Sequence, residues 1–325
     1  MNPPKCTDLD YIQFLIAAQR VFTCTEAARC HPEDNKPPAH DALTRLLCCR
    51  ESLQTLRLCG RKQRILILDD TTLDKPYARK IDLVTRHWSG KHKRVVQGIN
   101  LITLVWTDGV RIIPCDYRVY DAPNDGLTKN DHFRAMLKKA YYRGFKPKYV
   151  VFDSWYASLK NLKEIRRHSW YWLTRLKSNH LVNPDKKGNV QIKQVEIQPE
   201  GQVVHLKGYG FTRVFQTVTP NGDVEYWATN ELSMDHIICK KIARQGWVIE
   251  EYHRGLKQCC GVERAQARVA RAQRNHILYA IRAFLRLEIN RLRTGISWYE
   301  AKIAIIRDAI RNYLSNLLYS ISSTA

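Results

Sequence analysis

The spacing of apolar and polar positions divides the chain into helical, β-rich and again helical stretches. Residues 9–60 have the periodicity of amphipathic helices, and residues 234–318 return to it with Lys and Arg throughout. Between them, short apolar runs alternate with turns and with single helical stretches. The pattern therefore predicts a mixed α/β protein with helical N- and C-terminal regions.

Two apolar runs in the middle of the chain end at carboxylates. Residues 65–68 lead into Asp69 and Asp70, and residues 149–152 lead into Asp153. Such runs are typical of buried parallel strands whose carboxyl ends open onto an active site. We expect the first strand to end at Asp70. Because side chains alternate along a strand, only one of Asp69 and Asp70 can face the site, and the pattern does not decide which.

The elements between these carboxylates follow a definite order. The strand ending at Asp70 is followed by two strands at residues 98–106 and 110–119, and then by a helix at residues 130–142. Strand, hairpin, helix and strand is the order of an RNase H-like fold, whose first and fourth strands lie side by side. The sequence thus predicts an RNase H-like mixed sheet with flanking helices, in which Asp70 and Asp153 meet.

A second β-patterned segment, residues 180–232, follows the second carboxylate. We expect its strands at residues 190–197, 202–206, 211–218 and 224–228. It is interpreted as an all-β insertion that emerges at the rim of the active site. Trp227 in this insertion could stack on an unpaired base, although a tryptophan in a β-segment is more often part of a core.

These patterns predict five units. In chain order they are a helical N-terminal region that could bind DNA (1–60), the first part of a catalytic core (61–179), the all-β insertion (180–232), the second part of the core (233–290) and a helical tail (291–325). The first unit has a helix-turn-helix order. This order is equally compatible with DNA binding and with a purely structural three-helix support.

A third carboxylate, Glu250, lies in a helical stretch together with two cations. Arg254 and Lys257 follow it by four and seven residues, so the three side chains share one helix face. Glu251 falls on a different arc. Two strand-end carboxylates and one helical carboxylate can hold two Mg²⁺ or Mn²⁺ ions for an in-line phosphoryl displacement.

The charge of the chain indicates a polyanionic partner. It carries 53 Lys and Arg against 31 Asp and Glu, a formal net charge of +22, which is typical of nucleic-acid binding. In the basic loop 86–94, Lys91, Lys93 and Arg94 could contact the DNA backbone, and a solvated hairpin is an equal alternative. Without a long apolar run or a signal peptide, we expect a cytoplasmic, nucleoid-associated protein of a prokaryote and no membrane partner.

Residues 249–257 and 261–264 closely resemble the third signature of insertion-sequence transposases of the DDE cut-and-paste class. That signature is a Tyr, an Arg three residues on, a Glu four further and a Lys seven further. The context of Asp70 is similar to the first carboxylate motif of the class, and residues 149–154 are similar to the second. The resemblance spans about residues 60–290. It includes an all-β insertion between the second and third motifs.

The resemblance implies a role for each matching residue. Asp70, Asp153 and Glu250 would be the metal carboxylates for two Mg²⁺ or Mn²⁺ ions. The implied contacts with DNA phosphates are Arg254 and Lys257. Arg244 and Arg264 are further candidates for DNA contact, and Trp227 stays a candidate for base stacking. The signature Arg and Tyr are replaced by Gly246 and Ala243, and Arg244 is interpreted as a substitute from a shifted position.

The resemblance also implies a function. We expect a transposase that cuts double-stranded DNA at the element ends and joins them to target DNA, as a homodimer in the DNA complex. The alternatives are an RNase H-like nuclease without strand transfer and a DNA-binding regulator that has lost catalysis.

Overall fold

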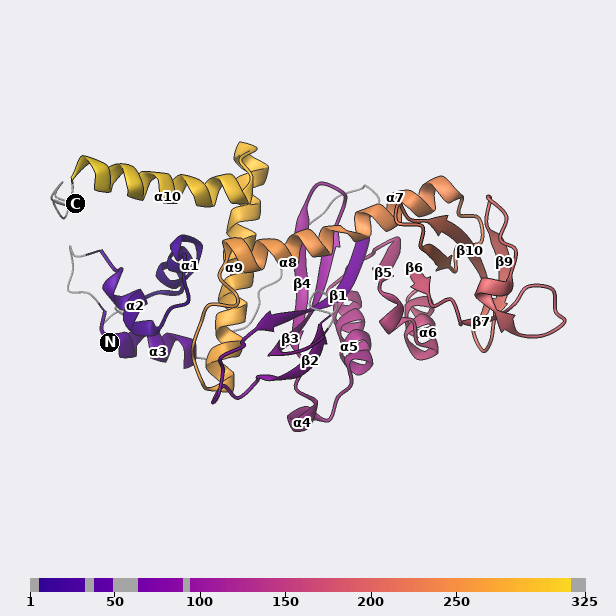
Figure 1. Cartoon of the computed structure of the whole chain (residues 1–325), viewed down its shortest axis with the longest axis horizontal. Helices are drawn as coiled ribbons and strands as arrows, with labels where there is room; N and C mark the ends of the chain where they lie inside the picture. Colours follow the sequence, from indigo (N-terminus) through magenta and orange to yellow (C-terminus); the bar gives the residue numbers. More distant parts are fainter. Residues whose placement is uncertain (1–5, 33–37, 49–63, 90–93, 317–325) are drawn as a thin grey trace, which may run out of the picture.

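The structure is a computed structural model that describes residues 6–32, 38–48, 64–89 and 94–316. The molecule is elongated. The N-terminal helices lie at one end, the mixed sheet lies in the middle, and the strands around residues 180–230 lie at the other end (Figure 1). Within the described ranges, no helix combines the length and the apolarity needed to cross a membrane.

Three helices form the N-terminal region. They are α1 (Asp8–Ala17), α2 (Cys24–Arg29) and α3 (His40–Cys48). The Thr7 side chain and Asp10 form a capping box that begins α1. Helices α1 and α3 pack on the long helix α9 (Ala270–Thr294), where the Tyr11 hydroxyl lies 3.1 Å from His276 Nδ1. The helical expectation for residues 9–60 is confirmed as far as Cys48, and residues 49–60 lie outside the described ranges.

The described residues contain eleven strands in one sheet, ordered β2-β3-β1-β5-β6-β11-β10-β9-β7-β8, with β4 paired to a second stretch of β3. Their bounds are β1 Ile65–Asp74, β2 Thr85–Ser89, β3 Arg94–Thr107, β4 Ile112–Val119, β5 Tyr149–Phe152, β6 Tyr171–Leu176, β7 Leu181–Asn183, β8 Val190–Gln191, β9 Gln202–Leu206, β10 Gly210–Val218 and β11 Val224–Thr229. Strand β1 is antiparallel to β3 and parallel to β5. The predicted adjacency of these two carboxylate-bearing strands is confirmed.

Helices cover both faces of the sheet. The remaining ones are α4 (Ala122–Asp125), α5 (Lys129–Tyr142), α6 (Leu159–Arg167), α7 (His236–Gly246), α8 (Val248–Cys259) and α10 (Trp298–Ser315), with short 3-10 turns at Ser154–Tyr156 and Ile192–Gln194. Ile65 and Ile67 of β1 are buried in one core with residues of α8 and α9. Leu66 and Leu68 are buried in a second core with residues of α5 and α6. The alternation of the strand thus separates an α8 face from an α5 face.

Two expected strand boundaries are wrong. Strand β1 does not end at Asp70 but runs to Asp74, because its pairing with β3 continues as far as the Asp74 and Gly98 pair. The strand expected at residues 190–197 ends at Gln191. The chain turns there because Ile192 buries its side chain in the α5-face core.

The β-patterned segment does not form a sheet of its own. Strand β11 pairs antiparallel with β6, from Tyr226 opposite Leu176 to Thr229 opposite Leu173. Strands β7 to β11 therefore extend the central sheet, and β6 is no longer an open edge. The coarse prediction of a large mixed sheet with flanking helices is confirmed.

Candidate active site

The carboxylates singled out in the sequence line one cavity of about 870 Å³ on the α8 face. It lies between the carboxyl half of β1, the end of β5 and the first turns of α8. The residues that line it are Asp69, Asp70, Thr71, Thr72, Asp74, Trp88, Asp153, Glu250, His253, Arg254, Lys257, Gln258, Glu263 and Arg264.

Asp69 and Asp153 project from the same face of the sheet. In the parallel pairing of β1 with β5, Leu68 lies opposite Phe152, so the next positions in register are Asp69 and Asp153. Asp69 is in phase with Ile65 and Ile67, whose side chains pack on α8 and α9. Because Glu250 lies in the first turn of α8, this register places all three carboxylates on one side of the sheet.

The electrostatics of Asp69 reflect this grouping. Burial raises the pKa of its carboxyl well above the usual range. The negative charges of Asp70, Glu250 and Asp153 act in the same direction. A carboxylate that is hard to ionise beside other carboxylates gains affinity for a cation that neutralises the group.

Asp70 also lines the cavity, but its carboxylate is held on the other face of β1, in a different environment. Its carboxylate accepts hydrogen bonds from Asn100 Nδ2, Lys129 Nζ and the Tyr156 hydroxyl, each at 2.7 Å. Burial opposes ionisation of Asp70, but the charge of Lys129 and the three hydrogen bonds outweigh it and lower the pKa. Asp70 is therefore already neutralised by protein groups that come from β3, α5 and the 3-10 turn after β5.

Asp153 links the cavity to the extended part of the sheet. Its carboxylate accepts a hydrogen bond from the Ser154 backbone N–H at 2.7 Å and one from Arg175 Nη2 at 3.1 Å. Arg175 also donates to Glu225 of β11 at 2.8 Å. The side chain of Asp153 is 44% exposed, so it remains accessible from the cavity.

Helix α8 is fixed to the strands by a buried hydrogen bond that the sequence did not suggest. His253 Nε2 lies 2.7 Å from Thr103 Oγ1, and Thr103 is the residue opposite Asp69 in the β1–β3 pairing. Burial and the charge of Lys257 lower the pKa of His253 to about 3, so the ring is neutral. His253 is buried, and its polar partner comes from a distant strand and leaves no local signal in the sequence.

The cations expected to contact DNA differ in their surroundings. Arg254 is exposed and lines the cavity. Lys257 Nζ forms an ion pair with Glu263 at 2.9 Å and donates to the Thr72 carbonyl at 2.6 Å. Arg264 also lines the cavity and donates to the Ala18 carbonyl of the N-terminal region.

The other candidates lie outside the cavity or beyond the described residues. Arg244 is exposed on α7, and Arg94 is exposed at the start of β3. Lys91 and Lys93 lie outside the described residues. Trp227 is half-buried against the α8-face core, and its Nε1 donates to Glu225 at 3.1 Å.

An exposed tryptophan that lines the cavity is Trp88 of β2, 68% exposed. The sequence placed Trp88 only in a loop of mixed aromatic and basic residues.

Gly246, which stands where the signature has an Arg, lies close to strand β5. A Cβ atom at Gly246 would lie 3.0 Å from Val151 Cγ1 of β5. A side chain at this position would therefore require the Val151 side chain to move by a few tenths of an ångström.

The donor set of the cavity fits hard divalent cations. Asp69, Asp153 and Glu250 offer carboxylate oxygens, which Mg²⁺ and Mn²⁺ prefer, and burial together with the neighbouring negative charges raises the pKa of Asp69. Within the described part of the chain, no three His, Cys, Asp or Glu side chains are already gathered closely enough to enclose an ion. The cavity thus supplies ligands of the right chemistry without a closed cage.

Comparison with known proteins gives three findings. A family model described as "Transposase DDE domain" matches residues 60–285. The probable transposase for insertion sequence element IS701 of Microchaete diplosiphon is 27% identical over 231 residues, which cover 63% of this chain and 57% of that protein. The chain thus aligns with less than two thirds of that relative's length.

The third finding is a likeness of fold. The cryo-EM structure of the piggyBac transposase synaptic complex with hairpin DNA has a TM-score of 0.57 at 10% identity. The match covers 100% of this chain and 78% of that chain.

Proposed function

The chain belongs to the transposase DDE domain family, and from this premise we propose that it is a DNA transposase. It would cut double-stranded DNA at the ends of an insertion sequence and join the resulting 3′-hydroxyls to target DNA. The observation that carries the proposal is the grouping of Asp69, Asp153 and Glu250 around one cavity. The net charge of +22 supports a DNA partner.

We propose Asp69, rather than Asp70, as the metal carboxylate of β1. Asp69 is in register with Asp153 and senses the charge of Glu250, whereas Asp70 is held by Lys129 on the other face. We also propose that the central sheet is the core of an RNase H-like fold. It is supported by the β3-β1-β5 order and by helices on both faces.

Asp69, Asp153 and Glu250 would hold two Mg²⁺ or Mn²⁺ ions. The ions, when bound, supply Lewis-acid activation of the attacking oxygen and charge stabilisation for the leaving oxygen. The chain's own groups orient the DNA. Arg254 can neutralise a phosphate beside Glu250, because it is exposed and lies one helical turn further along the same face.

The residues around the carboxylates hold them in place. The hydrogen bond of His253 with Thr103 fixes the rotation of α8 relative to Asp69. The Arg175 guanidinium restrains the Asp153 carboxylate until a cation or a phosphate replaces Arg175 as its partner. Such restraint is what positions catalytic groups within the narrow tolerance that phosphoryl transfer needs.

The partner is proposed to be double-stranded DNA, both element ends and target, bound by a homodimer. Strand transfer separates this function from that of a nuclease. The DNA that flanks the gene is first searched for inverted repeats. With Mg²⁺, the purified chain should join a pre-cleaved end that carries such a repeat to a supercoiled plasmid. Cleavage without any joined product would favour the RNase H-like nuclease. Binding without either reaction would favour the regulator.

A further inference from the structure

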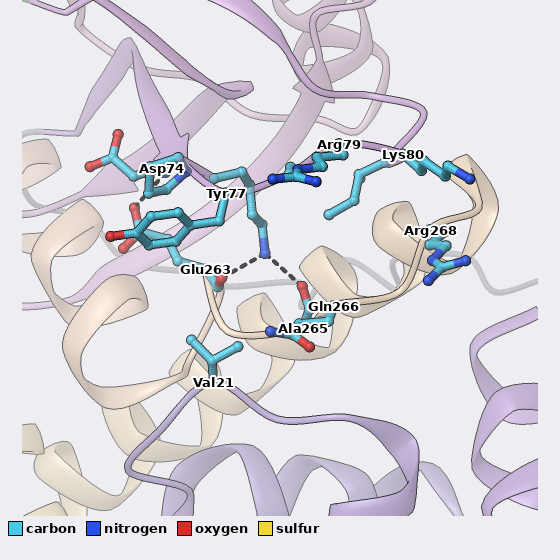
Figure 2. A pocket seen from close by; sticks show the side chains of 13 residues that line it. Val21, Asp74, Tyr77, Arg79, Lys80, Glu263, Ala265, Gln266 and Arg268 are labelled. Carbon is cyan, nitrogen blue, oxygen red and sulfur yellow. Dashed lines mark hydrogen bonds between the residues drawn. The ribbon is translucent and has the colours of Figure 1, made fainter.

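A second cavity lies beside the catalytic one. It has a volume of about 480 Å³ and is bounded by the loop after β1, residues 75–81, and by residues 263–268 between α8 and α9. Asp74 and Glu263 line both cavities, so the two are direct neighbours. Figure 2 shows Tyr77, Arg79 and Lys80 on the loop and Arg268 on the facing segment.

The walls of this cavity are fixed by hydrogen bonds. Lys75 Nζ donates to the carbonyls of Glu263 and Ala265, each at 2.6 Å, and thereby joins the loop to the facing segment (Figure 2). At the other end, the Asp82 backbone N–H donates to the Arg268 carbonyl at 3.0 Å. The Asp82 side chain also accepts from the Ala270 N–H at 2.9 Å. The backbone of the two walls is therefore held in place before any ligand binds.

The surface of the cavity combines positive charge with one exposed ring. Its lining has four Lys and Arg side chains against two carboxylates. One of these carboxylates, Glu263, is already paired with Lys257. Arg79, Lys80 and Arg268 are exposed. Tyr77 is 94% exposed, and an aromatic ring presented to water beside cations has the chemistry of a stacking platform for bases.

We propose that this cavity binds an unpaired nucleotide of the DNA strand that passes through the active site. Tyr77 stacks on the base, and Arg79, Lys80 and Arg268 contact the neighbouring phosphates. A base inside a duplex has both faces covered by its stacked neighbours, so the proposed occupant is an unpaired base. The inference rests on the proposed function, because the strand reaches the cavity from the catalytic carboxylates.

The length of strand β1 gives the distance between the stacked base and the scissile phosphate. Asp74, which lines both cavities, is five residues beyond Asp69 in β1, a distance of about 17 Å at 3.4 Å per residue. That length corresponds to roughly five nucleotides of a B-form strand and to fewer if the strand is extended. The stacked base should therefore lie a few nucleotides from the scissile phosphate.

The test compares two DNA probes without divalent metal, so that no cleavage occurs. One is a fluorescein-labelled duplex of arbitrary sequence with an extension of about eight unpaired thymidines, within the size of a single-strand site. The other is the same duplex with blunt ends. We expect Tyr77→Ala to weaken binding of the extended probe by about 5- to 100-fold and binding of the blunt probe much less.

Matched variants control the comparison. Tyr77→Phe should keep the preference for the extended probe, because stacking needs the ring and not the hydroxyl. Tyr142→Ala removes another tyrosine, 81% exposed on α5, and should behave like the wild-type protein. Arg268→Ala should lower the salt slope for the extended probe by about 0.7 in log K per log salt. Equal losses for Tyr77→Ala and Tyr142→Ala, or no loss for Tyr77→Ala, would overturn the proposal.

The two proposals fail in different ways. A wild-type protein that cleaves and joins DNA but shows no dependence on Tyr77 would refute the stacking site alone. A protein that shows the Tyr77-dependent preference but neither cleaves nor joins DNA would refute the transposase activity alone. Thermal unfolding of Tyr77→Ala should match that of the wild-type protein, since the side chain is almost fully exposed.

Discussion

The two faces of β1 place neighbouring aspartates in opposite environments. Asp69 faces α8 with Asp153 and Glu250, and burial and like charges raise the pKa of its carboxyl. Asp70 faces α5, where Lys129 Nζ at 2.7 Å and two further donors satisfy its carboxylate. Asp69 lies among other carboxylates, whereas the Asp70 carboxylate has a closed set of donors.

This difference separates a site prepared for a ligand from one that is structurally complete. A buried carboxylate without a cation is costly, and a divalent ion lowers that cost. A carboxylate that already has an ammonium group and two more hydrogen bonds gains little from a metal. Under the proposed assignment, the same residue type one position apart would serve catalysis on one face and packing on the other.

The largest expected effect is on catalysis at the α8 face. Glu250→Gln keeps the shape of the side chain but removes a charged ligand. Cleavage in Mg²⁺ should therefore fall by about a hundred- to a thousandfold, the loss typical of removing one preorganised group. DNA binding, measured by anisotropy, should change little. The control is Glu251→Gln, because Glu251 is exposed on the next arc of α8 and does not line the catalytic cavity. Equal losses for both variants would contradict the assignment.

A second expected effect is on stability and has opposite signs on the two faces. In the metal-free protein at neutral pH, Asp70→Asn should lower the free energy of unfolding by about 3 kcal/mol, because it leaves Lys129 without its anionic partner. Asp69→Asn should raise the free energy of unfolding, because it removes a charge that its surroundings disfavour. Urea denaturation of both variants checks this. A loss of stability in Asp69→Asn would contradict the contrast.

The pH dependence of stability should report the link between α8 and the strands. The pKa of His253 is about 3 in the folded protein and about 6.5 in an unfolded chain, so the unfolded chain binds one more proton between these values. Stability should thus fall as pH drops from about 6.5 towards 3, by about 1.4 kcal/mol per unit for this residue. His253→Gln keeps a polar atom near Thr103 but cannot titrate, so it should lose this contribution. A variant with an unchanged slope would show that His253 does not titrate as described.

The smallest expected effect concerns phosphate contacts at the cavity. Arg254→Ala should lower the salt slope of DNA binding by about 0.9 in log K per log salt, because Arg254 is exposed and lines the cavity. Lys257→Ala should act mainly on stability, because Lys257 is held by Glu263 and the Thr72 carbonyl. Affinity measured across a salt series, together with urea denaturation, separates the two. Equal changes in slope would show that Lys257 also contacts DNA.

Much of the central sheet was predictable because the local pattern carries it. The apolar runs before Asp69 and Asp153 and the helix at Lys129–Tyr142 have strong periodicity and clear ends. The end of β1 was not predictable, because its polar second half is stabilised by pairing with β3 and not by its own side chains. The extension of the sheet by β11 likewise depends on a partner strand, β6, about fifty residues away in sequence.

The candidate site was predictable as a set of motifs and not as a geometry. Glu250, Arg254 and Lys257 share a helix face by spacing alone. The choice between Asp69 and Asp70 depends on which face α8 covers and on where Lys129, Asn100 and the Tyr156 hydroxyl project. These contacts join residues far apart in the chain, so no local pattern records them.

The most direct test of the difference between the two faces is cleavage by Asp69→Asn and Asp70→Asn side by side. Both variants should be assayed in Mg²⁺ and Mn²⁺, below the unfolding temperature of the weaker one, with Mn²⁺ affinity measured by calorimetry. We expect Asp69→Asn to lose Mn²⁺ binding and cleavage while it stays folded, and Asp70→Asn to keep both at reduced stability. Loss of Mn²⁺ binding in a folded Asp70→Asn protein, with cleavage intact in Asp69→Asn, would contradict this assignment and make Asp70 the metal ligand.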